Sequence, residues 1–308
     1  MKPTIKLPST PVEWARYAFA AVVLGLIYYA FWRQSTGELA AWPWLYAHWQ
    51  GTSHYSHGPL IPWIALGLVW WKRQQLWAAT VRPVSWGAGL IGLAMLIYYV
   101  GVKAANPRLV VVSFILLLYA LVLTLAGREV FRVLFFPISF LFLMIPLNFL
   151  EERIGLPLRM MVAQASTGVL NTLGIETLRV GTAIHSSVFR FDVADPCSGI
   201  RSLMALTTVT AAYAYVTQSA QWKRWVLFLS AIPLAVLGNM ARVTSIALVA
   251  QVYGQELATK AYHDWSGYIV FGVALSAMVL LGQLLNLPYR HYWNRWMRPV
   301  PAAAVAHE

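Results

Sequence analysis

The fold class is set by long apolar runs, one of which covers residues 225–252 and reads WVLFLSAIPLAVLGNMARVTSIALVAQV. Arg242 is the only charged residue in this run. About 20 consecutive apolar residues are enough to cross the hydrocarbon core of a bilayer as a helix. The chain of 308 residues is 59% hydrophobic and 11% charged, whereas a soluble domain has roughly 25% charged residues. The sequence therefore predicts an all-α integral membrane protein.

Similar runs elsewhere in the chain predict about eight transmembrane helices within one multi-pass domain, residues 1–308. The expected spans are residues 14–32, 55–71, 84–102, 109–127, 133–150, 199–217, 225–252 and 262–288. An even number of spans puts both termini on one side. More Lys and Arg residues fall on that side than on the other, so the positive-inside rule places both termini in the cytoplasm.

The longest connection on the opposite, external side covers about residues 151–196 and carries two patterns. Apolar residues recur at helical spacing after Pro157 and stop near Gly174, which predicts an amphipathic helix in the interface plane. Two alternating runs follow, at residues 178–184 and 189–193. They predict a small β-hairpin packed on the outer face, although an irregular loop remains the alternative.

Composition excludes several classes of function. The net charge of +12 would suit nucleic-acid binding, but the basic residues are scattered over short loops and form no basic helix or patch. Cys197 is the only cysteine, which excludes an intramolecular disulfide and a metal site built on a cysteine pair. We therefore expect no nucleic-acid partner, no metal and no cofactor.

Ionisable residues are rare in the last three predicted spans, where they are Arg201, Arg242, His263 and Asp264. Such groups are costly inside a membrane and by default mark a functional site. The predicted topology places all four, together with Cys197, near the external surface of the bilayer. Three segments far apart in sequence would thus bring a thiol, guanidinium groups and an imidazole to one membrane level.

The residue types suit nucleophilic catalysis. Cys197 follows Asp195-Pro196, which is typical of a helix start, and a helix N-terminus favours the thiolate. Asn239 and Arg242 are three residues apart on one helix face and could stabilise an oxyanion. The alternatives are a small buried cysteine and a structural Asn–Arg pair.

His263 opens the segment HDWSGYIVF, residues 263–271, and could act as a general acid or base. His263, Gly267 and Phe271 would line one stripe, where Gly267 would let another backbone come close. Asp264 is a weaker supporting candidate. The alternative is an isolated histidine at the membrane interface.

A fourth candidate is the segment Tyr55-Ser56-His57-Gly58 at the outer mouth of the second span. His57, with His54 just before it, could contact a ligand. The absence of nearby carboxylates or cysteines gives a metal little support. The alternative is a wet segment at the membrane interface.

The motifs PCSGIRS (residues 196–202), NMARV (239–243) and HDWSGYIVF, in this order, resemble the exosortase/archaeosortase family. The YSHG segment resembles that family's N-terminal region, so the similarity covers roughly residues 50–280. It implies a membrane cysteine transpeptidase with a catalytic set at Cys197, Arg242 and His263. Asn239, Arg201, Ser198, Asp264 and His57 are supporting or substrate-binding candidates.

The resemblance also implies the reaction and its place. Substrates would be secreted proteins with a C-terminal sorting signal of the Pro-Glu-Pro type (PEP-CTERM), processed through a thioester and transferred to an unknown acceptor. The enzyme would lie in the bacterial inner membrane with its site on the periplasmic side. A multi-pass transporter, a membrane acyltransferase using His263 and a structural subunit are the alternatives. A transporter would place its ionisable groups near the bilayer midplane.

Overall fold

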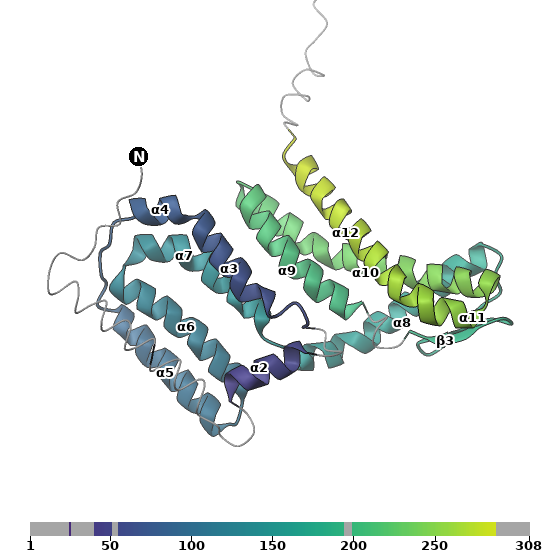
Figure 1. Ribbon diagram of the computed structural model, residues 1–308, viewed down its shortest axis with the longest axis horizontal. Coiled ribbons are helices and arrows are strands. Elements are labelled where there is room, and N and C mark those ends of the chain that lie inside the picture. The colour runs from purple at the N-terminus through teal and green to yellow at the C-terminus, as the bar shows by residue number, and fades with distance from the viewer. Residues whose placement is uncertain (1–24, 26–39, 51–54, 194–198, 288–308) are drawn as a thin grey trace, which may run out of the picture. The chain divides into compact units, whose positions relative to one another are not determined.

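The structure is a computed structural model that describes residues 25, 40–50, 55–193 and 199–287. Most of these residues form helices, and a small three-stranded sheet lies among them in the sequence (Figure 1). The chain divides into two compact units: Met1–Arg159 with Ala194–Thr208, and Met160–Val193 with Val209–Glu308. The organisation as one multi-pass domain stays a prediction.

The first unit is built from helices around an α5–α6 hairpin. Asn106 caps α6, because its side chain accepts hydrogen bonds from the N–H groups of Arg108 and Leu109, and Pro107 occupies the first helical position, where no N–H is needed. Gly101 leaves room for Leu109 and Val110 of α6. The elements of this unit are α2 (Ala41–Trp49), α3 (Leu60–Trp71), α4 (Arg73–Ala78), α5 (Gly87–Lys103), α6 (Pro107–Leu125), α7 (Arg128–Phe140), the 3-10 helix η1 (Leu141–Met144) and the starts of α8 and α9.

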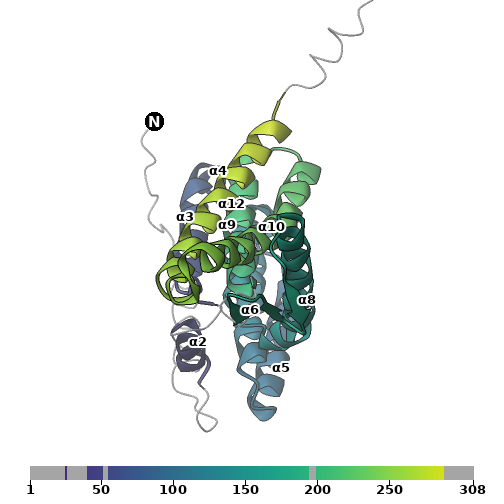
Figure 2. The same ribbon diagram turned by 90° about the vertical axis from the view of Figure 1, so that its right-hand side faces the viewer.

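The second unit is organised by the packing of α10 along α12, which Figure 2 shows from the side. Thr210 on α9 donates to the Sδ of Met278 on α12 at 3.0 Å, and Gln218 donates to the carbonyl of Gly282 at 3.1 Å. The elements are the remainder of α8 (Asn148–Thr172), β1 (Leu178–Val180), β2 (Ala183–His185), β3 (Arg190–Asp192), the remainder of α9 (Ile200–Thr217), α10 (Gln221–Tyr253), α11 (Gln255–Leu257), the π-helix η3 (Ala258–Tyr262) and α12 (His263–Leu285).

Three helices of the described residues are long and apolar enough to cross a membrane: α6, α10 and the Trp265–Leu285 part of α12. Two more, α3 and α5, are apolar but shorter. These helices are those of a membrane protein and agree with the predicted spans at 109–127, 225–252 and 262–288. The predicted span 14–32 lies outside the described residues except for residue 25, and the total of eight stays a prediction.

The predicted span 133–150 is interrupted in the structure. Helix α7 ends at Phe140, a 3-10 turn follows, and α8 begins only at Asn148. The backbone between them is held by distant side chains. Trp49 Nε1 donates to the carbonyl of Met144, and Arg108 Nε to that of Pro146. These bonds satisfy peptide groups that a continuous helix would have paired, so the break is tolerated.

The prediction that Pro157 opens the external helix is wrong. Pro157 lies inside α8, which begins nine residues earlier at Asn148. A proline inside a helix costs about 3 kcal/mol, which burial offsets here: Val162, Ala163 and Leu170 of α8 are buried. The helix does end before Gly174, as predicted. Gly174 has a φ of +84° and the next N–H reaches back to the carbonyl of Leu170 at 3.0 Å, as in a Schellman cap.

The predicted β-hairpin is instead a three-stranded antiparallel sheet of order β1-β2-β3. The first alternating run splits at Gly181, whose φ of +63° turns the chain so that Val180 pairs with Ala183. The central residue Ile184 pairs with Arg179 on one side and Phe191 on the other, and it is fully buried. The pattern of two apolar runs indicates only the turn between them, so the additional turn at Gly181 was not predicted.

Candidate functional site

Arg242 and His263, two of the predicted site residues, are in contact within the second unit. Arg242 lies on α10 and His263 is the first residue of α12. Nη2 of Arg242 is 3.4 Å from Nε2 of His263 and donates to the backbone carbonyl of His263 at 2.9 Å. Because a guanidinium can only donate, the side-chain contact requires Nε2 of His263 to be the accepting, unprotonated nitrogen.

Ser266 completes this cluster and was missed by sequence reasoning. Arg242 Nε donates to Ser266 Oγ at 3.2 Å, and Ser266 Oγ donates to the carbonyl of His263 at 2.8 Å. The side chain of Ser266 is buried. Its position three residues after His263, on the same face of a helix, was the available signal.

Gly267 makes room for the guanidinium. A Cβ on Gly267 would lie 3.4 Å from both Cζ and Nη2 of Arg242, so the charged plane of Arg242 rests against the bare backbone of α12. The close approach predicted for Gly267 thus involves a side chain, and not another backbone. One turn further along, Gly238 of α10 faces Val270 of α12, and a Cβ there would meet Cγ1 at 3.0 Å.

Asn239 is buried on α10, one turn before Arg242. Residues three apart share a helix face, so Asn239 and Arg242 lie along the same side of α10. This is the side that packs toward α12 at Gly238 and Arg242.

His263 is preceded by an irregular helical segment, the π-helix η3. Such segments are rare and occur frequently at functional sites. The short helix α11 leads into η3 and begins at Gln255, whose side chain accepts from the N–H of Arg190 at 3.1 Å and donates to its carbonyl at 2.8 Å. The pairing holds strand β3 on the helical segment that leads to His263.

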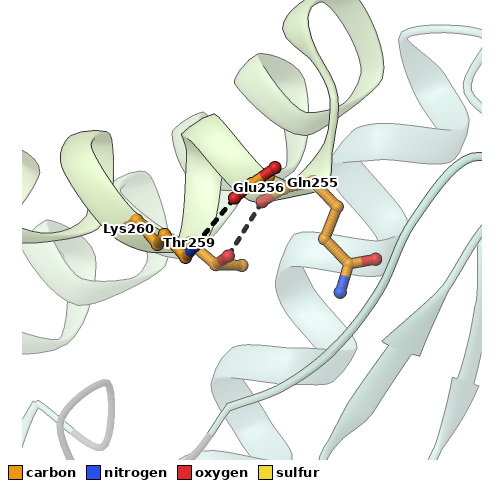
Figure 3. A network of polar contacts seen from close by, with 4 residues as sticks. All are labelled: Gln255, Glu256, Thr259 and Lys260. Atoms are coloured by element: carbon orange, nitrogen blue, oxygen red, sulfur yellow. Dashed lines mark hydrogen bonds and ion pairs between the residues drawn. The ribbon is translucent and has the colours of Figure 1, made fainter.

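Figure 3 shows the short-range contacts of this segment. Thr259 Oγ1 donates to the carbonyl of Gln255 at 2.8 Å, and Lys260 pairs with Glu256 at 2.7 Å. The Lys260 and Glu256 side chains are 75% and 82% exposed. An ion pair this exposed contributes little to stability, so the Gln255–Arg190 pairing is the more important anchor.

The other predicted residues are not part of this cluster as described. Cys197 and Ser198 lie outside the described residues. Asp264 belongs to α12, but its side chain is not among those described. Arg201 is exposed on the first turn of α9 and belongs to the first unit, whereas Arg242 and His263 belong to the second.

His57 lies in the first unit, in the turn before α3. Its ring stacks on Tyr55 with centroids 5.9 Å apart, and the Tyr55 hydroxyl accepts from the N–H of Leu147 at 2.8 Å. Burial lowers the pKa of His57. Its Nδ1 is buried and has no hydrogen-bond partner among the described residues. The next residue, Gly58, lies against the indole of Trp49, so that a Cβ on Gly58 would overlap the ring.

Within the part of the chain that the structure describes, no three His, Cys, Asp or Glu side chains are grouped to hold a metal ion. The cluster consists of the guanidinium of Arg242, the imidazole of His263 and the hydroxyl of Ser266. Together they supply hydrogen-bond donors and a proton carrier, which are the parts that acyl transfer needs beside a nucleophile.

Comparison with known proteins identifies a family. No curated protein and no solved structure matches the chain. A family model described as transmembrane exosortase matches residues 49–280, which is most of the chain and includes Tyr55-Ser56-His57-Gly58, Cys197, Arg242 and His263. The chain belongs to the transmembrane exosortase family.

Proposed function

We propose that the protein is a membrane cysteine transpeptidase that cleaves the C-terminal sorting signal of secreted proteins and transfers them to an acceptor. The observation that carries this proposal is the contact between Arg242 and His263. Family membership supports it, because exosortases as a class imply this chemistry. The substrate signal would consist of a short motif of the Pro-Glu-Pro type, a transmembrane helix and a basic cytoplasmic end.

In the first half of the reaction, Nε2 of His263 takes the proton of the Cys197 thiol, and the resulting thiolate attacks the carbonyl carbon of the scissile peptide. Arg242 and Asn239 stabilise the oxyanion of the tetrahedral intermediate with donated hydrogen bonds. The C–N bond then breaks and His263 gives a proton to the leaving amine. The products of this step are a thioester on Cys197 and the released C-terminal helix.

In the second half, His263 takes a proton from the acceptor amine as that amine attacks the thioester carbonyl. The C–S bond breaks, the new amide forms and the thiolate of Cys197 is restored. Water in place of the amine would give hydrolysis. Ser266 and the carbonyl of His263 orient the guanidinium of Arg242 throughout.

The remaining residues have supporting roles in this proposal. Arg201 attracts the acidic residue of the recognition motif, and Ser198 and Asp264 support Cys197 and His263, respectively. His57, in the first unit, is a substrate-binding candidate. The site faces the periplasm of the bacterial inner membrane, with both chain termini in the cytoplasm.

The test is co-expression of a tagged candidate substrate with the wild type and with Cys197→Ser, Arg242→Ala and His263→Ala. We expect unprocessed substrate to accumulate in all three variants, and normal processing with the control Arg153→Ala, which changes an exposed arginine of α8. Normal processing by Cys197→Ser would overturn the proposal. An acyltransferase would require His263 and not Cys197.

Because Cys197 is the only thiol, the orientation can be tested separately. An impermeant maleimide added to spheroplasts should label the protein. Labelling that appears only after the inner membrane is broken would place the site on the wrong side.

A further inference from the structure

Four segments of the first unit meet at one end of its helices: the end of α3, helix α4, residues 79–86 and the start of α7 (Figure 1). The N–H of Arg82 donates to the carbonyl of Ala126 at 3.2 Å, and the N–H of Val84 to that of Thr124 at 3.3 Å. The N–H of Thr80 donates to the carboxylate of Glu129 at 2.8 Å. Residues 79–86 are thus fixed against the turn between α6 and α7.

Three cation–indole pairs cover this end. Lys72 Nζ lies 4.7 Å from the ring centroid of Trp71, Arg73 Cζ 4.9 Å from that of Trp70, and Arg128 Cζ 5.6 Å from that of Trp86. We refer to these six residues as the cation–indole surface. The three tryptophans are 67% (Trp70), 46% (Trp71) and 53% (Trp86) exposed. Cation–π contacts hold each positive charge next to an exposed aromatic face.

The charge at this end is strongly positive. Residues 72–86 and 126–132 contain five Lys and Arg residues, which include Arg82 and Arg132, against the single carboxylate of Glu129. Hydrogen bonds from Thr80 and the charges of Arg82 and Arg132 lower the pKa of Glu129. That carboxylate is engaged by Thr80, Arg82 and Arg132, none of which belongs to the cation–indole surface.

Helix α3 is apolar but shorter than the hydrocarbon core of a bilayer. Its 12 residues span about 18 Å at 1.5 Å per residue, which is less than the roughly 30 Å of a hydrocarbon core. A short apolar helix is accommodated by local thinning and by flanking residues that reach the interface. Tryptophan and basic side chains are the residues that do so.

We propose that the cation–indole surface binds the headgroups of anionic phospholipids. Lys72, Arg73 and Arg128 contact the phosphate, while the indoles of Trp70, Trp71 and Trp86 lie at the boundary between glycerol and acyl chains. Charge complementarity selects anionic over zwitterionic lipid. The binding is independent of the proposed peptidase chemistry.

The experiment is native mass spectrometry of the full chain in neutral detergent with equimolar phosphatidylglycerol and phosphatidylcholine. The variant is Arg73→Gln with Arg128→Gln. The matched control is Lys103→Gln with Arg153→Gln, which removes the same net charge from exposed positions elsewhere. We expect the wild type and the control to retain phosphatidylglycerol preferentially. In the variant, the preference should fall on the order of fivefold for each cation removed.

Three outcomes would overturn the proposal. Equal retention of both lipids by the wild type would show that the surface does not select charge. An equal loss of preference in the control would show a general effect of net charge. Abolition of the preference by millimolar inorganic phosphate would indicate a phosphate site instead of a lipid surface. The melting temperature of each variant in phosphatidylcholine shows whether it is folded.

Discussion

Arg242 and Ser266 are joined by a hydrogen bond of 3.2 Å between Nε and Oγ, although they lie on different helices. The same hydroxyl donates to the carbonyl of His263, which also accepts from Nη2 of Arg242. The guanidinium is therefore held at two of its nitrogens by one turn of α12. Its orientation is fixed by α12 before any substrate arrives, as the oxyanion donor of the proposed reaction requires.

Replacement of this hydroxyl should slow processing without unfolding the protein. A hydrogen bond to a charged group contributes about 1.5–3 kcal/mol, so we expect Ser266→Ala to lower the processing rate at least roughly tenfold. Ser276→Ala is the control, since Ser276 is exposed on the same helix and donates to the carbonyl of Gly272 one turn before it. The measurement is the rate at which tagged substrate is converted in membranes.

The positioning role can be separated from a structural one with Arg242→Ala. If Ser266 acts through Arg242, Ser266→Ala should have no further effect on the residual rate in an Arg242→Ala background. Independent, multiplicative losses would contradict the role assigned to Ser266.

Gln255 should hold strand β3 on the segment that leads to His263. We expect Gln255→Ala to speed hydrogen exchange in β3 and the η3 segment, because both bonds to the Arg190 backbone are lost. The neighbouring variant Glu256→Gln breaks only an exposed ion pair and should leave exchange unchanged. Equal exchange in the two variants would show that β3 is held by other contacts.

Local sequence patterns predicted the features that depend on neighbouring residues alone, such as an apolar helix and a helix end at a glycine. The apolar run at 109–127 became α6, and the end of α8 at Gly174 followed from the need for a positive φ. The helix start predicted at Pro157 was wrong. A proline favours the first turn of a helix locally, but buried residues such as Leu170 keep α8 continuous through Pro157.

The break after α7 and the role of Ser266 depend on contacts that no local pattern contains. Trp49 and Met144 are 95 residues apart, and Tyr55 and Leu147 are 92 apart. The sequence placed Arg242 and His263 at one membrane level from helix lengths alone. It could not reveal which side chains of α12 would meet the guanidinium, since that depends on the rotation of both helices.

His57 should make the first unit less stable in acid. Burial lowers its pKa from the ordinary 6.5, so the unfolded chain binds a proton at higher pH than the folded one. The resulting stability is present above pH 6.5 and is lost as the pH falls from there through the depressed folded value. We expect the melting temperature to fall over this range, and to fall less in His57→Phe, which keeps a ring against Tyr55. Parallel curves for the two proteins would show that His57 has no part in the acid effect.

Gly127 should be among the glycines least tolerant of a side chain. Its φ of +85° and ψ of −174° are nearly exclusive to glycine, and a Cβ there would overlap the carbonyl oxygen of Arg82. Backbone strain alone costs about 1–3 kcal/mol, and the overlap would also separate residues 79–86 from the α6–α7 turn. We expect Gly127→Ala to lower the melting temperature in detergent. Gly92→Ala is the control, because Gly92 lies within α5 with open space around it and alanine there should add up to about 1 kcal/mol of helix propensity. Equal stability of the two variants would show that residues 79–86 are not fixed at Gly127.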